Sequence, residues 1–329
     1  MEIQKIKDLA NTLAEKEDAD VLLYNGEIER PFDDELLDLC LNAERRKNVF
    51  LFLCTHGGNP DAAYRMARCL QDNYEKFTIF ISGKCKSSGT LIALGAHEVV
   101  MTAHAELGPL DIQLGKKDEL FETDSGLTVL NALSELENKA FELFENSFIK
   151  LKYKSEGRIT LKTATSIANE LAIGLMAPIM SQIDPIHVGQ VSRAMKIGKE
   201  YGRRLSAISK NLQEGALATL VDTYPSHGFV IDRKEADELF SNVRGANEDE
   251  FYLIKELGVA ARNQNPYDPI LTSLSTWKKK EIQNEGNRPE NGEQEQSSGE
   301  QAVGELQGNG EAGEQREGVV AQLHPRQGG

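Results

Sequence analysis

The stretch "NVFLFLCTHGGNPDAAYRMARCL", residues 48–70, joins a strand pattern to a helix pattern through a pair of glycines. Residues 48–55 form an apolar run without polar alternation, which is typical of a strand buried on both faces of a parallel sheet. Asn59, Pro60 and Asp61 then supply a helix cap, an early proline and an acid in the first turn. The stretch therefore predicts a strand, a turn and a helix of an α/β fold.

Similar units lie on both sides of this stretch. Apolar runs at 21–26, 77–83 and 98–103 alternate with helical patterns at 33–45 and 88–96. Alternation of this kind predicts βαβ units with right-handed crossovers around a parallel sheet.

The character of the chain changes twice after these units. Beyond residue 125 the apolar spacing becomes helical. The last 49 residues hold ten Gly, ten Glu and three Arg and no aromatic residue, which is too little apolar surface to offset the entropy of ordering. We therefore predict an N-terminal helix at 1–20, an α/β domain at 21–245, a helical extension at 246–280 and a disordered acidic tail at 281–329.

The charge and the cysteines limit the partners and the compartment. The 329 residues include 37 Lys and Arg against 52 Asp and Glu, a net charge of −15, which argues against nucleic acid as a partner. Cys40, Cys54, Cys69 and Cys85 stand singly in apolar surroundings without metal-ligand spacing. Buried thiols of this kind are typical of the reducing cytosol, so we predict a cytoplasmic location and no metal.

Two features of the sequence bear on membrane association. No secretory signal is visible at the N-terminus, and no run of about 18 apolar residues predicts a spanning helix. The amphipathic segment 1–15 leaves peripheral contact with a membrane open, although its acids disfavour it.

Two turns leave the regular pattern where strands end. Gly57 and Gly58 free backbone amides to point at a ligand, although paired glycines also form ordinary tight turns. At Ser87-Ser88-Gly89 a serine stands between a strand and a helix, where the next N–H can act as an oxyanion donor. A serine there can also be a simple helix cap. Because both turns follow adjacent strands of one sheet, their combination predicts acyl transfer.

The order of three motifs, THGGNP, CKSSGTL and AELGPLD, resembles the serine dehydrogenase proteinase family. This family is a branch of the Clp protease/crotonase-like fold and is related to the signal peptide peptidase A proteases. The likeness covers residues 20–245 and implies a spiral of βαβ units with a helical C-terminal part. The family name records an association with serine dehydrogenase. Since no GxGxxG motif is present, we predict no cofactor.

The resemblance implies roles for residues of both turns. Ser87 aligns with the nucleophile, and the amides of Gly58 and Ser88 with the oxyanion hole. Gly57 and Gly89 accompany them at the substrate side, where a peptide would add a strand to the sheet. If the turn between the strand and the helix is shifted by one residue, Ser88 is the nucleophile instead.

The general base has three candidates. In the signal peptide peptidase branch a later lysine activates the serine, and Lys139 has apolar neighbours in a helical window that could lower its pKa. Asp111 aligns with the histidine of the Clp protease subunit, and His104 lies earlier in the same loop. Lys116 and Lys117 are rivals of Lys139, and Lys86 is a candidate electrostatic helper.

These residues predict a serine peptidase that acts on a peptide or protein through a Ser87 acyl-enzyme. Two alternatives keep the fold: a crotonase-like acyl-thioester enzyme, and a catalytically idle peptide-binding or scaffolding protein. The resemblance also implies a homo-oligomer. The helix at 127–153 could form its contact or pack within the subunit through Leu130, Leu133, Leu136, Phe141, Phe144 and Phe148.

Two further turns stand out. Asp184 to Gly189 reads as a helix cap with His187 as an alternative site residue. The stretch YPSHG at 224–228 resembles a recurrent stretch of the family, and we interpret it as a structural turn.

Overall fold

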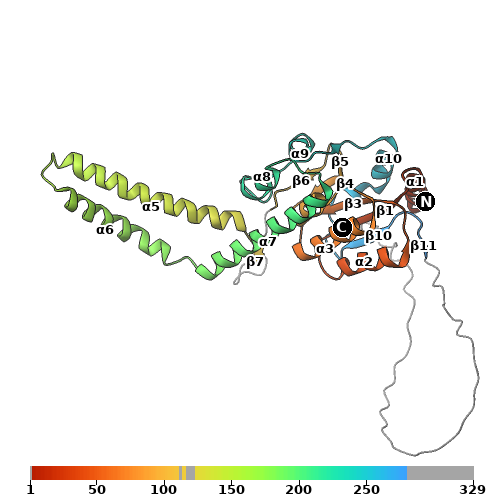
Figure 1. The fold of residues 1–329 in the computed structure, drawn as a ribbon, viewed down its shortest axis with the longest axis horizontal. Helices are drawn as coiled ribbons and strands as arrows, with labels where there is room; N and C mark the ends of the chain where they lie inside the picture. Colours follow the sequence, from red (N-terminus) through yellow and green to blue (C-terminus); the bar gives the residue numbers. More distant parts are fainter. Residues whose placement is uncertain (1, 111–112, 116–122, 280–329) are drawn as a thin grey trace, which may run out of the picture. The chain divides into compact units, whose positions relative to one another are not determined.

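A computed structural model describes residues 2–110, 113–115 and 123–279 (Figure 1). The chain divides into Met1–Glu281 and Ile282–Gly329, and only the first unit is described here. The predicted tail and Asp111 lie outside the described residues. The predicted domain boundaries therefore stay predictions.

The first unit is built on a mostly parallel sheet, as the apolar runs predicted. In spatial order its strands are β10 (Ile270–Ser273), β1 (Ala19–Asn25), β3 (Asn48–Thr55), β4 (Lys76–Cys85), β5 (Glu98–Met101) and β9 (Val243–Arg244), with β6 (Glu106–Leu107) paired to β4. Only β10 at one edge runs antiparallel to its neighbour. The α/β fold class is confirmed, and it places the ends of β3 and β4 next to each other.

Helices cover the sheet and extend beyond it. They are α1 (Glu2–Glu17), α2 (Phe32–Asn42), α3 (Pro60–Asn73), α4 (Ser88–Leu94), α5 (Gly126–Lys154), α6 (Leu161–Met180), α7 (Pro185–Ser209), α8 (Ala216–Asp222), α9 (Arg233–Leu239) and α10 (Glu248–Leu257). As predicted, Asn59 caps α3 and Asp184 caps α7 with their side-chain oxygens.

Both faces of the central strands are buried, which explains their continuous apolar runs. Because successive side chains point to opposite faces, Leu51 and Ile79 pack with α2, α3 and α4, whereas Phe50, Phe52 and Phe80 pack with α1 and α10. The rings of Phe52 and Phe80 stack with centroids 4.4 Å apart.

The apolar face of α1 belongs to the second of these cores. Ala10, Leu13 and Ala14 are buried there. The face of residues 1–15 that the sequence left open for a membrane is therefore occupied by the protein's own sheet.

Residues 246–280 differ from the predicted helical extension. They contain α10, but β10 completes the edge of the main sheet and β11 (Lys278–Lys279) pairs with β2 (Ala43–Glu44). The physical reason is that β1 has an open edge whose N–H and C=O groups need partners, and β10 supplies them.

Helices α5 and α6 pack side by side as an antiparallel hairpin, and α7 continues to α3 and α4 of the sheet unit (Figure 1). Two short strands, β7 (Gln113–Gly115) and β8 (Thr123–Ser125), precede the hairpin. Within the described residues, no individual helix has the length and apolarity to cross a membrane. By length and composition α6 and α7 pass as a pair bent by 74°.

Candidate active site

The diglycine bend follows β3 directly. Gly57 and Gly58 have φ angles of 126° and 134°, a region that side chains other than glycine rarely adopt. A Cβ on Gly58 would also lie 2.2 Å from the carbonyl oxygen of Ile28. The second reason for glycine is therefore the close approach of two backbones.

The serine elbow follows β4. Ser87 has φ 51° and ψ −115°, and α4 begins at the next residue. A non-glycine residue in such a conformation costs roughly 1–3 kcal/mol, so its surroundings must hold it. Gly89 is also required, because a Cβ there would lie 2.6 Å from the side chain of Thr55.

The two bends face each other. A Cβ on Gly57 would lie 2.8 Å from the Cβ and 3.3 Å from the Oγ of Ser87. The Ser88 hydroxyl donates a hydrogen bond of 2.7 Å to the Gly58 carbonyl, and the Lys86 amide donates one of 3.0 Å to the Thr55 carbonyl. The structure thus brings Ser87, Ser88, Gly57 and Gly58 together.

The amides of these residues differ in their partners. The Gly57 amide donates to the Thr55 hydroxyl at 3.0 Å, and the Gly89 amide donates to the Lys86 carbonyl at 2.8 Å. In the parts of the chain that the structure describes, the Gly58 and Ser88 amides donate no hydrogen bond. Of the four predicted oxyanion or substrate residues, only these two keep an N–H for a ligand.

The orientation of the Gly58 amide follows from its bridge with Ile28. Ile28 donates to the Gly57 carbonyl and accepts from the Asn59 amide, at 2.8 and 2.6 Å. In a parallel bridge of this kind the N–H and C=O of the middle residue point the other way. The Gly58 carbonyl meets the Ser88 hydroxyl there, so the Gly58 amide lies on the elbow side, and Gly58 itself is exposed.

Lys86 is the buried cation of the elbow. Its ammonium donates to the carbonyls of Leu107 and Phe229, each at 3.0 Å, and lies 3.3 Å from the Glu106 carboxylate. Only 9 % of its side chain is exposed. The sequence offered no signal for these partners, because two of them are backbone carbonyls.

The three predicted bases have different environments. Lys139 lies on α5 with 63 % of its side chain exposed and pairs with Glu142 at 2.7 Å. Its hydrogen bond to Glu142 raises the pKa of Lys139, contrary to the predicted lowering by apolar neighbours. His104 is exposed in a turn after β5. Asp111 lies outside the described residues, and so the assignment of a base stays a prediction.

His56 is a neighbour of the site that the sequence reasoning missed. Partial burial, followed by the charges of Lys84 and Lys86, lowers the pKa of His56, which keeps its imidazole neutral near pH 7. Its amide donates to the side chain of Gln264. Its position directly before the diglycine was the signal that could have drawn attention to it.

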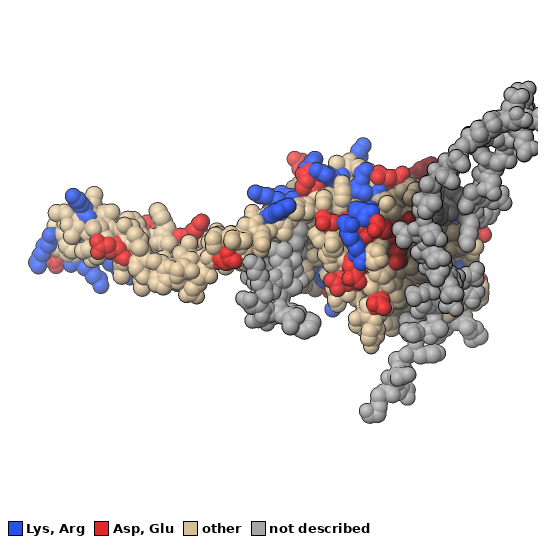
Figure 2. Space-filling view, turned by 90° about the horizontal axis from the view of Figure 1, so that it is seen from below, with Lys and Arg blue, Asp and Glu red and all other residues tan. Residues whose placement is uncertain are grey.

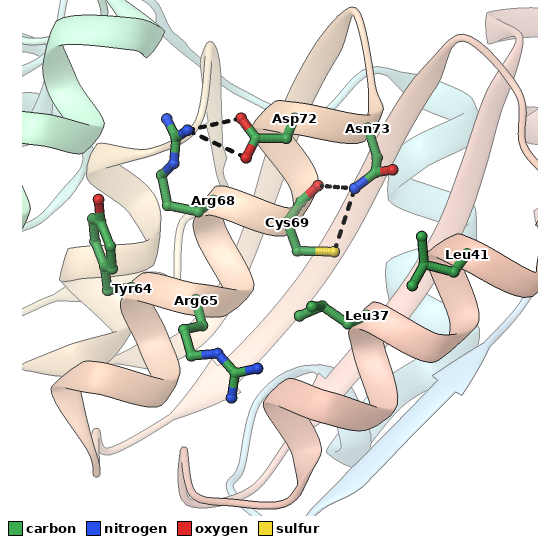
Figure 3. Close-up of a pocket in the computed structure, with 8 residues that line it drawn as sticks. All are labelled: Leu37, Leu41, Tyr64, Arg65, Arg68, Cys69, Asp72 and Asn73. Carbon is green, nitrogen blue, oxygen red and sulfur yellow. Dashed lines mark hydrogen bonds and ion pairs between the residues drawn. The ribbon is translucent and has the colours of Figure 1, made fainter.

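A separate hollow of about 320 Å³ lies between α2 and α3 (Figure 3). Its cations already have partners, since Arg65 bonds Asp33 and Asp34 and Arg68 bonds Asp72. None of its lining residues belongs to either bend. The side chains of Arg65 and Arg68 are about one-third exposed.

All four cysteines are buried free thiols, as predicted. Burial raises the pKa of Cys54 to about 11 and raises that of Cys85 as well. Neither thiol is therefore a nucleophile at neutral pH.

The mostly parallel sheet, whose adjacent strands end in a diglycine bend and a serine elbow, is an α/β fold similar to the ClpP-like type. The model of the ClpP-like SDH-type serine proteinases matches residues 33–140. This match confirms the resemblance to the serine dehydrogenase proteinase family over the segment that contains both bends.

Other similar proteins cover smaller shares or differ more. The uncharacterized protein MJ0137 of Methanocaldococcus jannaschii is 35 % identical over 83 residues, and MJ1495 of the same organism is 37 % identical over 68 residues. These matches cover 25 % and 21 % of this chain, which spans less than a third of either relative: 29 % and 23 % of their lengths.

Two solved structures of a 1510-N membrane-bound stomatin-specific protease are also similar. One is a serine-to-alanine mutant, with a TM-score of 0.29 and 19 % identity over 46 % of this chain and 68 % of that one. The other is a lysine-to-alanine mutant in complex with a substrate peptide, with a TM-score of 0.30 and 20 % identity over 46 % and 64 %.

Proposed function

We propose that the protein is a serine peptidase in which Ser87 is the nucleophile. The observation that carries this proposal is the meeting of the two bends, with the Ser87 Oγ 3.3 Å from where a Cβ of Gly57 would lie. The match of residues 33–140 to ClpP-like serine proteinases supports it.

In the proposed reaction the Ser87 hydroxyl attacks the carbonyl carbon of a peptide bond and gives its proton to a base. The oxyanion that forms accepts hydrogen bonds from the Gly58 and Ser88 amides. Each such donor is worth roughly 10²–10³ in rate. The base then protonates the leaving amine, and water hydrolyses the acyl-enzyme in a second step.

The substrate is proposed to be an extended peptide. Gly58 is exposed beside the ends of β3 and β4, and its bridge with Ile28 turns its amide to the side of the elbow. A strand laid along this bend would add main-chain hydrogen bonds without needing particular side chains. Side-chain preference then depends on neighbours such as His56.

For the base, Lys139, His104 and Asp111 are each to be replaced by Ala. If Lys139 is the base, it must leave Glu142 and become desolvated in the active form, because a lysine with a raised pKa holds its proton at pH 7. The base is the residue whose loss reduces activity as far as the loss of Ser87 does.

The test of the proposal is labelling by a fluorophosphonate, which forms a covalent bond with an activated serine. We expect labelling of the unmutated protein and of Ser88→Ala, and none of Ser87→Ala, with peptide hydrolysis reduced roughly 10⁴-fold in the last. Ser88→Ala is the matched control, since it removes the neighbouring hydroxyl but keeps the amide.

Two results would contradict the proposal. An unlabelled protein that binds acyl thioesters would be an enzyme of the crotonase-like kind. An unlabelled protein that binds peptides equally well with and without Ser87 would be a binding or scaffolding protein.

We also propose that the α5–α6 hairpin binds a second copy of the chain. On α6 the residues facing α5 are small, with Ala164, Ala168 and Ala172 buried. The neighbouring row of α6, displaced by one residue from the alanines, has large apolar side chains at every fourth residue. These side chains are exposed: Ile167, Leu171, Leu175 and Ile179. Four of the predicted residues of α5 are half-buried: Leu133, Leu136, Phe144 and Phe148. Phe141 is exposed, and the side chain of Leu130 is outside the described part.

The amount of exposed apolar surface supports this occupant. Seven large apolar side chains of α6 are each more than 40 % exposed, and Phe141, Ile149 and Tyr153 of α5 add to them. So many exposed large apolar side chains on one pair of helices are typical of a surface that a partner covers. Figure 2 shows the same hairpin as mostly tan, with blue gathered at its end.

The charges of α5 favour an antiparallel partner. Its middle part, residues 135–145, carries four glutamates and the single cation Lys139, and its last part carries Lys150, Lys152 and Lys154. In a two-fold pairing the acidic middle part of one copy lies beside the basic end of the other. A second copy therefore complements both the apolar stripe and the charges.

Light scattering of the full chain tests the pairing. We expect a dimer or larger assembly that Leu171→Glu with Leu175→Glu converts to a monomer. Ile186→Glu, at an even more exposed apolar position on α7, is the control and should leave the assembly intact. A monomeric unmutated protein that binds lipid vesicles through the same residues would show a membrane surface instead. The cytoplasmic location stays a prediction.

A further inference from the structure

The conformation of Ser87, with φ 51° and ψ −115°, is tied to the backbone of its neighbour Lys86. Three backbone bonds hold this turn: the Lys86 amide donates to the Thr55 carbonyl, the Gly89 amide to the Lys86 carbonyl, and the Leu91 amide to the Ser87 carbonyl. Two of the three involve Lys86. A contact that fixes Lys86 therefore helps to fix the direction of the neighbouring serine.

The side chain of Lys86 is fixed from two remote segments. Its three N–H groups have three acceptors: the carbonyl of Leu107, the carbonyl of Phe229 and the carboxylate of Glu106. Its stem passes so close to Gly108 that a Cβ there would lie 2.7 Å from the Lys86 Cδ. The lysine is thus held at both its charge and its methylenes.

The two segments that bind Lys86 are joined to each other. Leu107 and Ile231 exchange two backbone hydrogen bonds of 3.0 Å. The Thr90 hydroxyl donates to the Gly108 carbonyl at 2.8 Å, which ties the same segment to α4. The YPSHG turn at 224–228 precedes Phe229, and the rings of Tyr224 and Phe229 pack 4.8 Å apart. This turn gains a role that its sequence did not indicate: it presents the Phe229 carbonyl.

We infer that Lys86 is a positioning residue that clamps the serine elbow onto the 106–108 and 224–231 segments. The inference rests on the proposed function, since it concerns the reactivity of Ser87. Lys86 acts through the backbone of the elbow and does not touch the reacting atoms.

The ammonium of Lys86 is engaged by three oxygens. It donates hydrogen bonds to the Leu107 and Phe229 carbonyls and lies 3.3 Å from the Glu106 carboxylate. These contacts assign Lys86 a positioning role, which the pH profile distinguishes from the role of a base.

The first experiment compares Lys86→Met with Lys84→Met. Both replace a lysine by a side chain of similar length near the end of β4, but the Lys84 residue is exposed. We expect fluorophosphonate labelling of Ser87 and kcat to fall roughly 10²-fold in Lys86→Met, the size of effect that a misplacement of about 1 Å produces. KM should change much less, and Lys84→Met should stay within about twofold of the unmutated protein.

The pH profile separates positioning from acid–base chemistry. A positioning role lowers the rate at every pH. It leaves unchanged the midpoint of the limb on which the rate rises with pH, which reports the ionisation of the base. Loss of that limb in Lys86→Met would make Lys86 the base and overturn the inference. An unchanged labelling rate would overturn it as well.

A second pair of variants keeps the test valid if Lys86→Met does not fold. Gly108→Ala pushes the lysine stem and leaves its charge, whereas Gly228→Ala adds a methyl to the adjacent turn where nothing lies within 4 Å. We expect a roughly tenfold lower labelling rate in Gly108→Ala, and the unmutated rate in Gly228→Ala. Equal rates in both variants would contradict the clamp.

The result for the unmutated protein keeps the two proposals apart. If the unmutated protein is not labelled, the proposed function fails whatever Lys86 does. If it is labelled and all Lys86 and Gly108 variants match it, the peptidase stands and the clamp fails.

Discussion

Glycines of the sheet and glycines of the helical hairpin stand in opposite surroundings. At Gly26, Gly58 and Gly83 a Cβ would lie 2.5 Å or less from backbone atoms of another segment. At Gly174 in α6 and Gly189 in α7 nothing lies within 4 Å. The sheet unit therefore depends on backbones in close approach, whereas Gly174 and Gly189 lie where a larger side chain would fit.

Ion pairs differ between the same two regions. In the sheet unit Arg244 bonds both Glu98 and Glu250, and Glu250 is almost fully buried. On the hairpin Lys139 and Glu142 form a pair in which both side chains are more than half exposed. Together the two contrasts indicate that the bends of the site are held rigidly, while the outer face of the hairpin remains available for a partner.

Replacing Arg244 should have the largest effect. In Arg244→Met the buried Glu250 loses its cation, and such a loss costs about 3 kcal/mol, near the low end of its range because Arg244 is itself a third exposed. Urea unfolding measures the change. Lys139→Met, which breaks the exposed pair, should leave the free energy of unfolding essentially unchanged. Equal losses would remove the contrast between the regions.

Gly58→Ala comes next, at about 2–3 kcal/mol, since it combines an unfavourable φ with a Cβ 2.2 Å from the Ile28 carbonyl. The backbone must move to relieve this clash, and that movement displaces the Gly58 amide. We therefore also expect fluorophosphonate labelling to fall at least tenfold. A stable, fully labelled Gly58→Ala would show that neither the close approach nor the amide is needed.

Acidification should weaken the sheet unit through Glu98. Burial alone would raise the pKa of Glu98, but its hydrogen bonds and charge interactions with Arg244 and Lys76 outweigh burial and hold the pKa below 4.5. A depressed pKa stabilises the folded state above about pH 4.5, and this contribution is lost as the pH falls through the folded value. In Glu98→Gln, unfolding followed by circular dichroism should show a smaller change between pH 5 and 3. An unchanged dependence would exclude Glu98 as a contributor.

The sequence predicted some strands and helices of the sheet unit and missed others. Strands β1, β3 and β4 and helix α3 were predictable because long apolar runs and the Asn59 cap are local signals. Strand β10 was not, since its four half-buried residues gain their conformation only by pairing with β1.

The candidate site shows the same division. The meeting of the two bends followed from the adjacency of β3 and β4, a property of parallel sheets. Which amides remain available did not follow, because the Gly57 and Gly89 donors are used by Thr55 and Lys86 within the turns themselves. The partners of Lys86 were equally hidden, since a backbone carbonyl at Phe229 has no residue signature.

The smallest expected effects are on the helices and have the opposite sign. Gly189→Ala should stabilise the protein by up to about 1 kcal/mol, because alanine loses less backbone entropy in a helix and its Cβ meets nothing within 4 Å. Gly174→Ala should give the same gain if the outer face of α6 is bare. Gly174 lies between the exposed Ile173 and Leu175, so a second copy packed there would meet the added methyl. Unfolding is therefore measured at protein concentrations above and below that at which the assembly dissociates. Equal stabilisation of Gly174→Ala at both concentrations would contradict pairing through this face. Stabilisation that disappears only in the assembled protein would place the partner on this face.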